Sequence, residues 1–359
     1  MPDRDEHPEP EILPLIVERR ADEAPDTPLI IAAEGTVTCS ALNARANRIA
    51  RMLRDNGLSR SGSCAVMMAN SADAIATWIA IAKLAAVEVP INSAYRGEIL
   101  RHVLATAGCT MIVADAGFLP VLAEVAGKCP ELRLCICRGT APDDVSVSST
   151  LAILPFEAGL SPDGTNLGDP PGLADTACIL FTSGTTGPSK GAIIPHRQMI
   201  AFGETYRLIT AMTPADVTYN YLPFFHVAGK FNFMAPLIAG GRMVLRERLA
   251  VSGFWDDIRR HRCTVVTAVG GVCNMLHARP EAPDDADNPL RLIYAVPIPR
   301  EIAPAFTRRF GLTMVEGYGS TECNIVVWTP PEGAPHGACG RPGPWYEVAV
   351  VDTLDRPLP

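Results

Sequence analysis

No apolar stretch of this 359-residue sequence is long enough, and free enough of charge, to predict a membrane-spanning helix. The longest, residues 74–91, contains Lys83 and Glu88 and is predicted to be a buried helix that runs into a strand. The N-terminal segment MPDRDEHPEPE is acidic, whereas a secretory signal begins with basic residues and an apolar run. These features predict a cytoplasmic protein with no integral membrane segment.

The sequence also lacks the cysteine spacing of a zinc site. None of its 11 cysteines forms a CxxC pair, and the one close pair, Cys135 and Cys137, is spaced CxC. Several others, such as Cys64 and Cys178, lie inside apolar stretches. This pattern predicts reduced, buried thiols and not a disulfide framework.

An excess of positive charge is absent as well. The net charge is −8, which argues against a nucleic-acid-binding surface, since such surfaces need clustered Lys and Arg. Hydrophobic residues make up 48% of the chain and charged residues 19%, a composition that supports a large core. The length favours two domains or one large α/β unit.

Helix and strand patterns alternate along the sequence and predict an α/β fold. From Ser40, the expected cap of a helix, to residue 115 the order includes a βαβαβ unit, which is typical of a doubly wound parallel sheet. A Pro-, Ser- and Gly-rich stretch, residues 139–173, is the predicted linker. A second α/β region follows it.

The predicted domains are therefore a first α/β subdomain over residues 1–170 and a second over residues 171–330. We expect mostly parallel sheets in both. Residues 331–359 are rich in Pro and Gly and are predicted to begin a β-barrel, in which residues 346–352 (YEVAVVD) form the one clear strand.

The strongest functional signal is the segment TSGTTGPSKG, residues 182–191, directly after the predicted strand ACILF. Its glycines and hydroxyl residues favour a loop whose backbone amides turn toward an anion, and Lys190 adds a positive charge. The spacing differs from GxxxxGK[ST], so a standard P-loop is disfavoured. A plain surface loop is the weaker alternative. The predicted phosphate-binding residues are Thr182, Ser183, Gly184, Thr185, Thr186, Gly187 and Lys190.

This segment closely resembles the signature loop of the AMP-binding, adenylate-forming superfamily, with Pro188 and Ser189 in exchanged order. Two further segments resemble family motifs in the expected order. YLPFFHVAG, residues 221–229, resembles the segment beside the acyl pocket, and EGYGSTE, residues 316–322, resembles the adenine and magnesium motif. Three ordered motifs together identify the chain as a member of this superfamily.

The third motif offers chemistry that suits a nucleotide. Tyr318 presents an aromatic face on which adenine can stack, beside Gly319. Thr321 offers a hydroxyl to the α-phosphate, and Glu322 offers the carboxylate oxygens that Mg²⁺ prefers. The resemblance implies that Lys190, Thr321 and Glu322 are the catalytic residues.

Other positions match the family more loosely. Ala295, Val296 and Pro297 occupy the place of a turn that lines the adenine and substrate pocket. Gly270 and Gly271 lie where family members form a wall of the acyl pocket, although a strand-ending turn explains them equally well. His226 is a substrate-pocket residue or, equally, a polar core residue.

The resemblance implies ATP-dependent activation of a small carboxylic acid to an acyl-adenylate, with Mg²⁺, followed by transfer to CoA. Segments such as VPINSAYRGEILRHVL, residues 89–104, look most like acyl-CoA synthetases of the crotonobetaine/carnitine-CoA ligase type. The family's ribose-binding Asp, hinge and C-terminal domain have no counterpart in these residues. We therefore expect an N-terminal portion that is weakly active alone.

Two alternatives stay open at this point. One is a truncated nucleotide-binding relative without turnover, and the other is an adenylation domain that serves a carrier protein instead of CoA. The sequence identifies neither the acid nor the oligomeric state.

Overall fold

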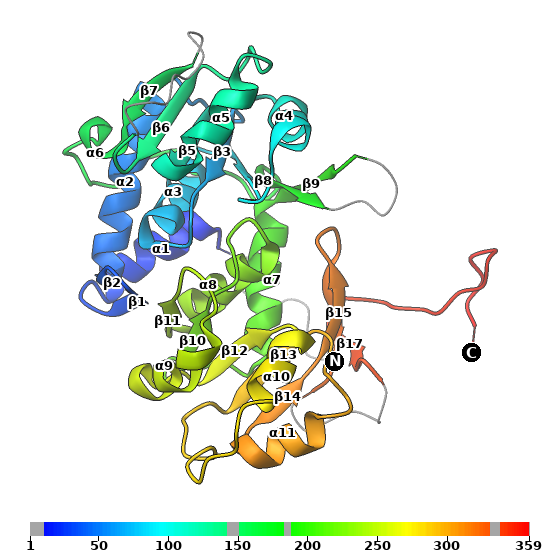
Figure 1. Ribbon diagram of the computed structural model, residues 1–359. Coiled ribbons are helices and arrows are strands. Elements are labelled where there is room, and N and C mark those ends of the chain that lie inside the picture. The colour runs from blue at the N-terminus through cyan, green and yellow to red at the C-terminus, as the bar shows by residue number, and fades with distance from the viewer. Residues whose placement is uncertain (1–10, 142–150, 183–187, 331–337, 359) are drawn as a thin grey trace.

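A computed structural model of the chain describes residues 11–141, 151–182, 188–330 and 338–358. It is an α/β structure with two seven-stranded, mostly parallel sheets and a small antiparallel sheet of three strands. Figure 1 shows the first large sheet and its helices above the second, with α7 (His196–Ile209) running between them. The expected fold class is confirmed.

The first sheet has the strand order β7-β6-β5-β3-β4-β8-β9. Its strands are parallel except for β9, which pairs antiparallel with β8. The strands are β3 (Ser63–Met67), β4 (Val87–Pro90), β5 (Cys109–Asp115), β6 (Leu134–Arg138), β7 (Ala152–Pro155), β8 (Thr176–Thr182) and β9 (Lys190–Pro195). The accompanying helices are α2 (Cys39–Asp55), α3 (Ala72–Lys83), α4 (Gly97–Thr106), α5 (Leu119–Ala126) and the short α6 (Phe156–Gly159).

The second sheet has the order β14-β13-β12-β10-β11-β1-β2. The strands are β1 (Pro28–Ala32), β2 (Gly35–Thr38), β10 (Val217–Asn220), β11 (Arg242–Leu245), β12 (Val265–Ala268), β13 (Leu292–Ala295) and β14 (Thr313–Val315). Its helices include α1 (Leu13–Glu23), α8 (Val227–Ala239), α9 (Phe254–His261), α10 (Gly270–His277) and α11 (Ala303–Phe310). The antiparallel sheet consists of β15 (Gly317–Ser320), β16 (Asn324–Trp328) and β17 (Arg341–Pro342).

Each large sheet contains strands from distant parts of the sequence. The N-terminal β1 pairs with β11 in the second sheet, and β8, from the middle of the chain, pairs with β4 in the first. The domain division expected at residues 170 and 171 stays a prediction, but the hydrogen-bonded sheets do not follow it. Sequence periodicity finds strands without naming their partners, which explains the difference.

Three local expectations differ from the structure. Thr38, and not Ser40, caps α2: its hydroxyl accepts a hydrogen bond from the backbone N–H of Ala41, and the Ser40 hydroxyl donates to the carbonyl of Pro25. The predicted linker contains β7, which pairs with β6. Among the described residues, 346–352 pair with no other strand and form only an isolated bridge from Val351 to Pro357.

The predicted helix-to-strand reading of residues 74–91 is confirmed, and both of its charges are buried and paired. Lys83 pairs with Glu18, and Glu88 on β4 lies 2.5 Å from the ammonium of Lys230 on α8. The Lys230 ammonium also sits 4.0 Å from the centroid of the Trp78 ring. Burial raises the pKa of Glu88, and Lys230 opposes that rise. This pair joins the first sheet to a helix that packs on the second.

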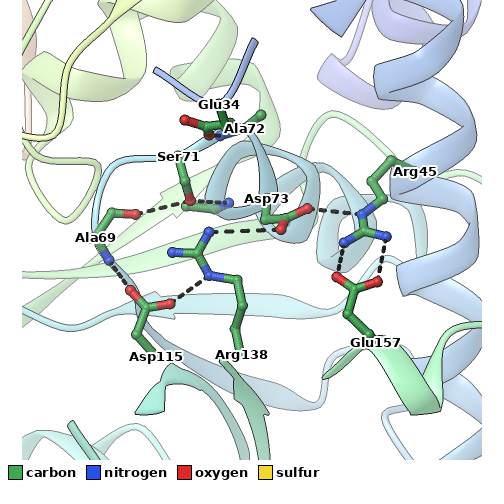
Figure 2. A network of polar contacts seen from close by, with 10 residues as sticks. Glu34, Arg45, Ala69, Ser71, Ala72, Asp73, Asp115, Arg138 and Glu157 are labelled. Atoms are coloured by element: carbon green, nitrogen blue, oxygen red, sulfur yellow. Dashed lines mark hydrogen bonds and ion pairs between the residues drawn. The ribbon is translucent and has the colours of Figure 1, made fainter. Parts of the chain in front are cut away.

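At its carboxyl edge, the first sheet carries a network of ion pairs (Figure 2). Arg138, at the end of β6, donates to Asp115 at the end of β5 over 2.6 Å. Arg45 on α2 joins Asp73 in the first turn of α3 to Glu157, at 2.9 and 2.5 Å. Open α/β sheets often bind ligands at this edge. Here each charged side chain has a partner within the network, which holds α2 and α3 on the sheet.

The composition also led to expectations about membrane-spanning helices and about the cysteines. Within the described ranges, no helix combines the length and apolar character needed to span a bilayer. All 11 cysteines are free, and all but Cys323 and Cys339 are buried. Burial raises the pKa of thiols such as Cys64 and Cys178, which keeps them protonated.

We predict that Lys230→Met alone lowers the free energy of unfolding by about 3–5 kcal/mol, because it leaves the Glu88 carboxylate buried without its partner. The double variant Glu88→Leu/Lys230→Met should recover most of that loss, since it removes both charges. Equilibrium denaturation in urea measures both. A double variant no more stable than Lys230→Met would contradict this account.

Candidate active site

One cavity of about 870 Å³ lies where the ends of several elements meet. Its walls come from β8, β9, α7, the start of α8, the ends of β12 and β13, and the turn between β15 and β16. The lining residues are Thr182, Lys190, Phe202, Leu222, Pro223, Phe225, His226, Val227, Ala228, Phe231, Thr267, Ala268, Val269, Tyr294, Val296, Gly317, Gly319, Ser320, Thr321, Glu322, Asn324 and Ile325. The structure thus brings Lys190, Thr321 and Glu322 into one space, although they are distant in sequence.

Thr182 and Lys190 end the two strands that carry the signature loop, and they are register partners across β8 and β9. The Ser189 hydroxyl donates to the carbonyl of Thr182 over 2.6 Å. The His102 Nε2, on α4, donates to the carbonyl of Ser189 over 3.0 Å. These contacts fix the stem of the loop. The predicted residues Ser183, Gly184, Thr185, Thr186 and Gly187 lie outside the described residues.

The turn after β15 carries Thr321 and Glu322. Its backbone is held by Gln198 on α7, whose amide Nε2 donates to the carbonyls of both residues over 3.0 Å each. The Ser320 hydroxyl accepts from the backbone N–H of Glu322 over 3.2 Å. Gly319 has no room for a side chain, because a Cβ there would lie 2.1 Å from the carbonyl of Asn324. The turn is therefore tightly fixed to α7.

Asn324 follows this turn and was missed by sequence reasoning. It is 1% exposed, has a φ of 75°, and donates from Nδ2 to the Thr205 hydroxyl and the Tyr346 hydroxyl over 3.0 and 2.7 Å. Gln198 was missed as well. The only signal for it was its position two residues after the start of α7, which follows directly on the strand of Lys190.

The turn after β13 contributes less than expected. Val296 lines the cavity, whereas Ala295 is fully buried and Pro297, joined to Val296 by a cis peptide bond, is not on the wall. Neither Gly270 nor Gly271 lines the cavity. They begin α10, and the adjacent residues Ala268 and Val269 form the wall instead. Tyr318 is 64% exposed and also lies off the wall. The binding roles of these residues stay predictions.

His226 lines the cavity and caps α8, where its Nδ1 accepts a hydrogen bond from the backbone N–H of Ala228 over 3.1 Å. Burial lowers the pKa of His226, which favours the neutral ring. His226 therefore has features of both predicted roles. It caps a helix, as a polar core residue can, and its ring borders the cavity.

Much of the remaining wall is apolar, and sequence reasoning did not single it out. Phe202 on α7, Phe231 on α8 and Ile325 on β16 contribute side chains to it. Phe202 lies one turn beyond Gln198, so α7 serves the polar and the apolar parts of the cavity. A space with this division suits a ligand that has both phosphates and an apolar group.

Among the described lining residues, the two fully charged side chains are Lys190 and Glu322. In the described part of the chain, no hydrogen bond or ion pair engages the Glu322 carboxylate, and no cluster of three His, Cys, Asp or Glu is present. A lone free carboxylate near hydroxyls fits Mg²⁺, which is commonly held by one or two carboxylates and the substrate's phosphates.

The family model described as "AMP-binding enzyme" matches residues 17–359, almost the whole chain. The chain belongs to the AMP-binding enzyme family. Its resemblance to that superfamily, first seen in three short motifs, is thereby confirmed over residues 17–359.

Among curated AMP-binding relatives, crotonobetaine/carnitine–CoA ligase of Salmonella paratyphi B is 30% identical over 328 residues. The aligned region covers 89% of this chain and 62% of the relative. The chain therefore spans less than two thirds of the length of that enzyme.

Solved structures of CoA ligases share the fold. The anthranilate CoA ligase AuaEII, in complex with anthranoyl-AMP, has a TM-score of 0.89 at 20% identity, covering 98% of this chain and 68% of that one. A putative long-chain-fatty-acid CoA ligase from Rhodopseudomonas palustris has a TM-score of 0.86 at 24% identity, covering 98% and 86%.

We predict that Gln198→Leu loosens the turn that carries Thr321 and Glu322, because two carbonyls lose their donor. Amide hydrogen exchange of residues 320–324 should become at least severalfold faster, with little change in global stability. The control is Arg197→Leu, an exposed neighbour on the same helix. Equal exchange rates in the two variants would show that Gln198 does not hold the turn.

Proposed function

We propose that this chain carries the nucleotide- and acid-binding part of an ATP-dependent acid–thiol ligase, which forms an acyl-adenylate and then an acyl-CoA. The observation that supports it best is a single cavity that combines Lys190, Glu322 and an apolar wall. The proposal takes the substrates to be ATP, CoA and a small carboxylic acid. A cytoplasmic location belongs to it as well.

In the first step, an oxygen of the substrate carboxylate attacks the α-phosphorus of ATP. The new oxygen–phosphorus bond replaces the bond to the bridging oxygen of the β-phosphate, and pyrophosphate leaves with the electron pair. Catalysis of this step rests mostly on positioning and on neutralising charge. Lys190 at the loop stem and Glu322 in its fixed turn offer both.

The proposal gives these residues distinct tasks. Lys190 and the Thr182 hydroxyl hold the β- and γ-phosphates, and the Thr321 hydroxyl donates to the α-phosphate. Glu322 would hold Mg²⁺, which when bound neutralises phosphate charge. Tyr318, Gly319 and the backbone of residues 295–297 are the proposed adenine contacts.

In the second step, the thiol of CoA attacks the acyl carbon. A carbon–sulfur bond forms, the bond from that carbon to the AMP oxygen breaks, and the thiol proton passes to solvent. The uncharged wall beside His226 would hold the acyl group in both steps, because apolar burial excludes competing water.

We expect Lys190→Ala to weaken ATP binding with little effect on folding, since Lys190 is exposed and lies at a strand end. A charge-assisted phosphate contact contributes about 1.5–3 kcal/mol, which corresponds to about a 10- to 100-fold rise in Kd. Calorimetric titration with ATP measures it, and Lys128→Ala on the exposed surface is the control. Unchanged affinity in the folded Lys190→Ala variant would argue against the proposal.

Glu322→Gln should weaken ATP binding in the presence of Mg²⁺ more than in the presence of EDTA, because the amide is a poorer ligand for a hard cation. Glu347→Gln, an exposed change outside the cavity, should leave both affinities unaltered. The measurement is the ratio of the two ATP affinities. Equal losses with and without Mg²⁺ would instead assign Glu322 a structural task.

A further inference from the structure

Apart from Glu322, the described residues of the cavity wall include no anionic side chain that could neutralise a cationic acyl group. The wall's two fully charged side chains in the described chain, Lys190 and Glu322, are the ones that the proposed function assigns to phosphate and Mg²⁺. The rest of the wall consists largely of carbon, with Phe225, Phe231 and Val296 among its residues.

The polar groups on that wall are neutral. Thr267 donates its hydroxyl to Tyr206 or Asn232, at 2.7 and 3.0 Å. Burial lowers the pKa of His226 and raises that of Tyr294. These groups can accept or donate a hydrogen bond but supply no negative charge.

Acidic residues behind the wall are already engaged. Glu88 is paired with Lys230, next in sequence to the wall residue Phe231. Glu316 does not line the cavity, and its carboxylate accepts from the backbone N–H of Ile298 over 3.2 Å. A permanent cation on the acyl group would therefore be buried beside ring faces but without a counter-ion. Ring faces offset only part of such a desolvation cost.

We propose that the acid taken by this site carries no positive charge, and that its tail packs against the side chain of Val296. The assignment rests on the proposed function. It distinguishes two tails of the same size and shape that differ in charge. One ends in a trimethylammonium group and the other in a tert-butyl group. The neutral tail is favoured because it loses only apolar hydration on burial.

Two matched probes test this with the chain as it is. Both are N-acylsulfamoyl adenosines, one with a γ-trimethylammoniobutyryl group and one with its carbon isostere, in which tert-butyl replaces trimethylammonium. Their shared adenosine makes the difference in Kd a measure of tail charge alone. Calorimetry should show the tert-butyl compound binding at least tenfold more tightly.

Two substitutions of Val296 test whether the tail of the acid binds beside this residue. Val296 is 39% exposed, so it can accept a polar side chain without loss of the core. Val296→Asp should reduce the preference for the neutral probe at least fivefold, whereas Val296→Asn, of the same shape but uncharged, should leave the preference within twofold of the wild type. Circular dichroism confirms that both variants fold.

The possible failures differ in what they overturn. Equal or tighter binding of the ammonium probe to the wild-type chain would overturn the charge assignment while leaving the adenylate site intact. An Asp variant that behaves like the Asn variant would overturn the placement of the tail at Val296. Binding of neither probe would overturn the proposed function, and this inference with it.

Discussion

Backbone hydrogen bonding across the two large sheets sets the constraint on which the rest of the molecule depends. The first sheet is complete only when β8 pairs with β4, and the second only when β1 pairs with β11. An unpaired strand edge that is buried leaves backbone N–H and C=O groups without hydrogen bonds, which is costly. Neither half of the sequence can therefore complete its own sheet. The chain must cross between the sheets, and the cavity forms at the crossing, where β8, β9 and α7 meet the turn after β15.

A few polar contacts then hold the two sheets at a fixed angle. Glu88 and Lys230 form one, and Asn70 forms another by donating from Nδ2 to the carbonyls of Leu222 and Arg246 over 3.0 and 3.1 Å. Leu222 lines the cavity, so this contact ties the cavity wall to the loop after β3. Specific hydrogen-bonded geometry complements the apolar packing, which is not directional. The shape of the cavity therefore depends on residues that do not touch its contents.

Residue patterns predicted the alternation of strands and helices before residue 115, and they predicted the helix that runs into a strand over residues 74–91. They also singled out Lys190 and Glu322, which line the cavity, because each belongs to a short segment of recognisable chemistry; the roles of both residues stay predictions. They could not predict that β1 pairs with β11 or that β8 pairs with β4, because periodicity carries no information about pairing partners. Gln198 and Asn324 were not predicted for a related reason. Both act through hydrogen bonds to residues more than a hundred positions away in the sequence.

The pairing of β1 with β11 also bears on how the chain folds as it is made. Ile30 lies opposite Met243, so β1 leaves the ribosome roughly two hundred residues before the strand that pairs with it. At ~5–20 residues per second, that wait lasts roughly 10–40 s. During this interval the apolar strand β1 is paired with β2 on one edge only, and its other edge is open to aggregation until β11 is made.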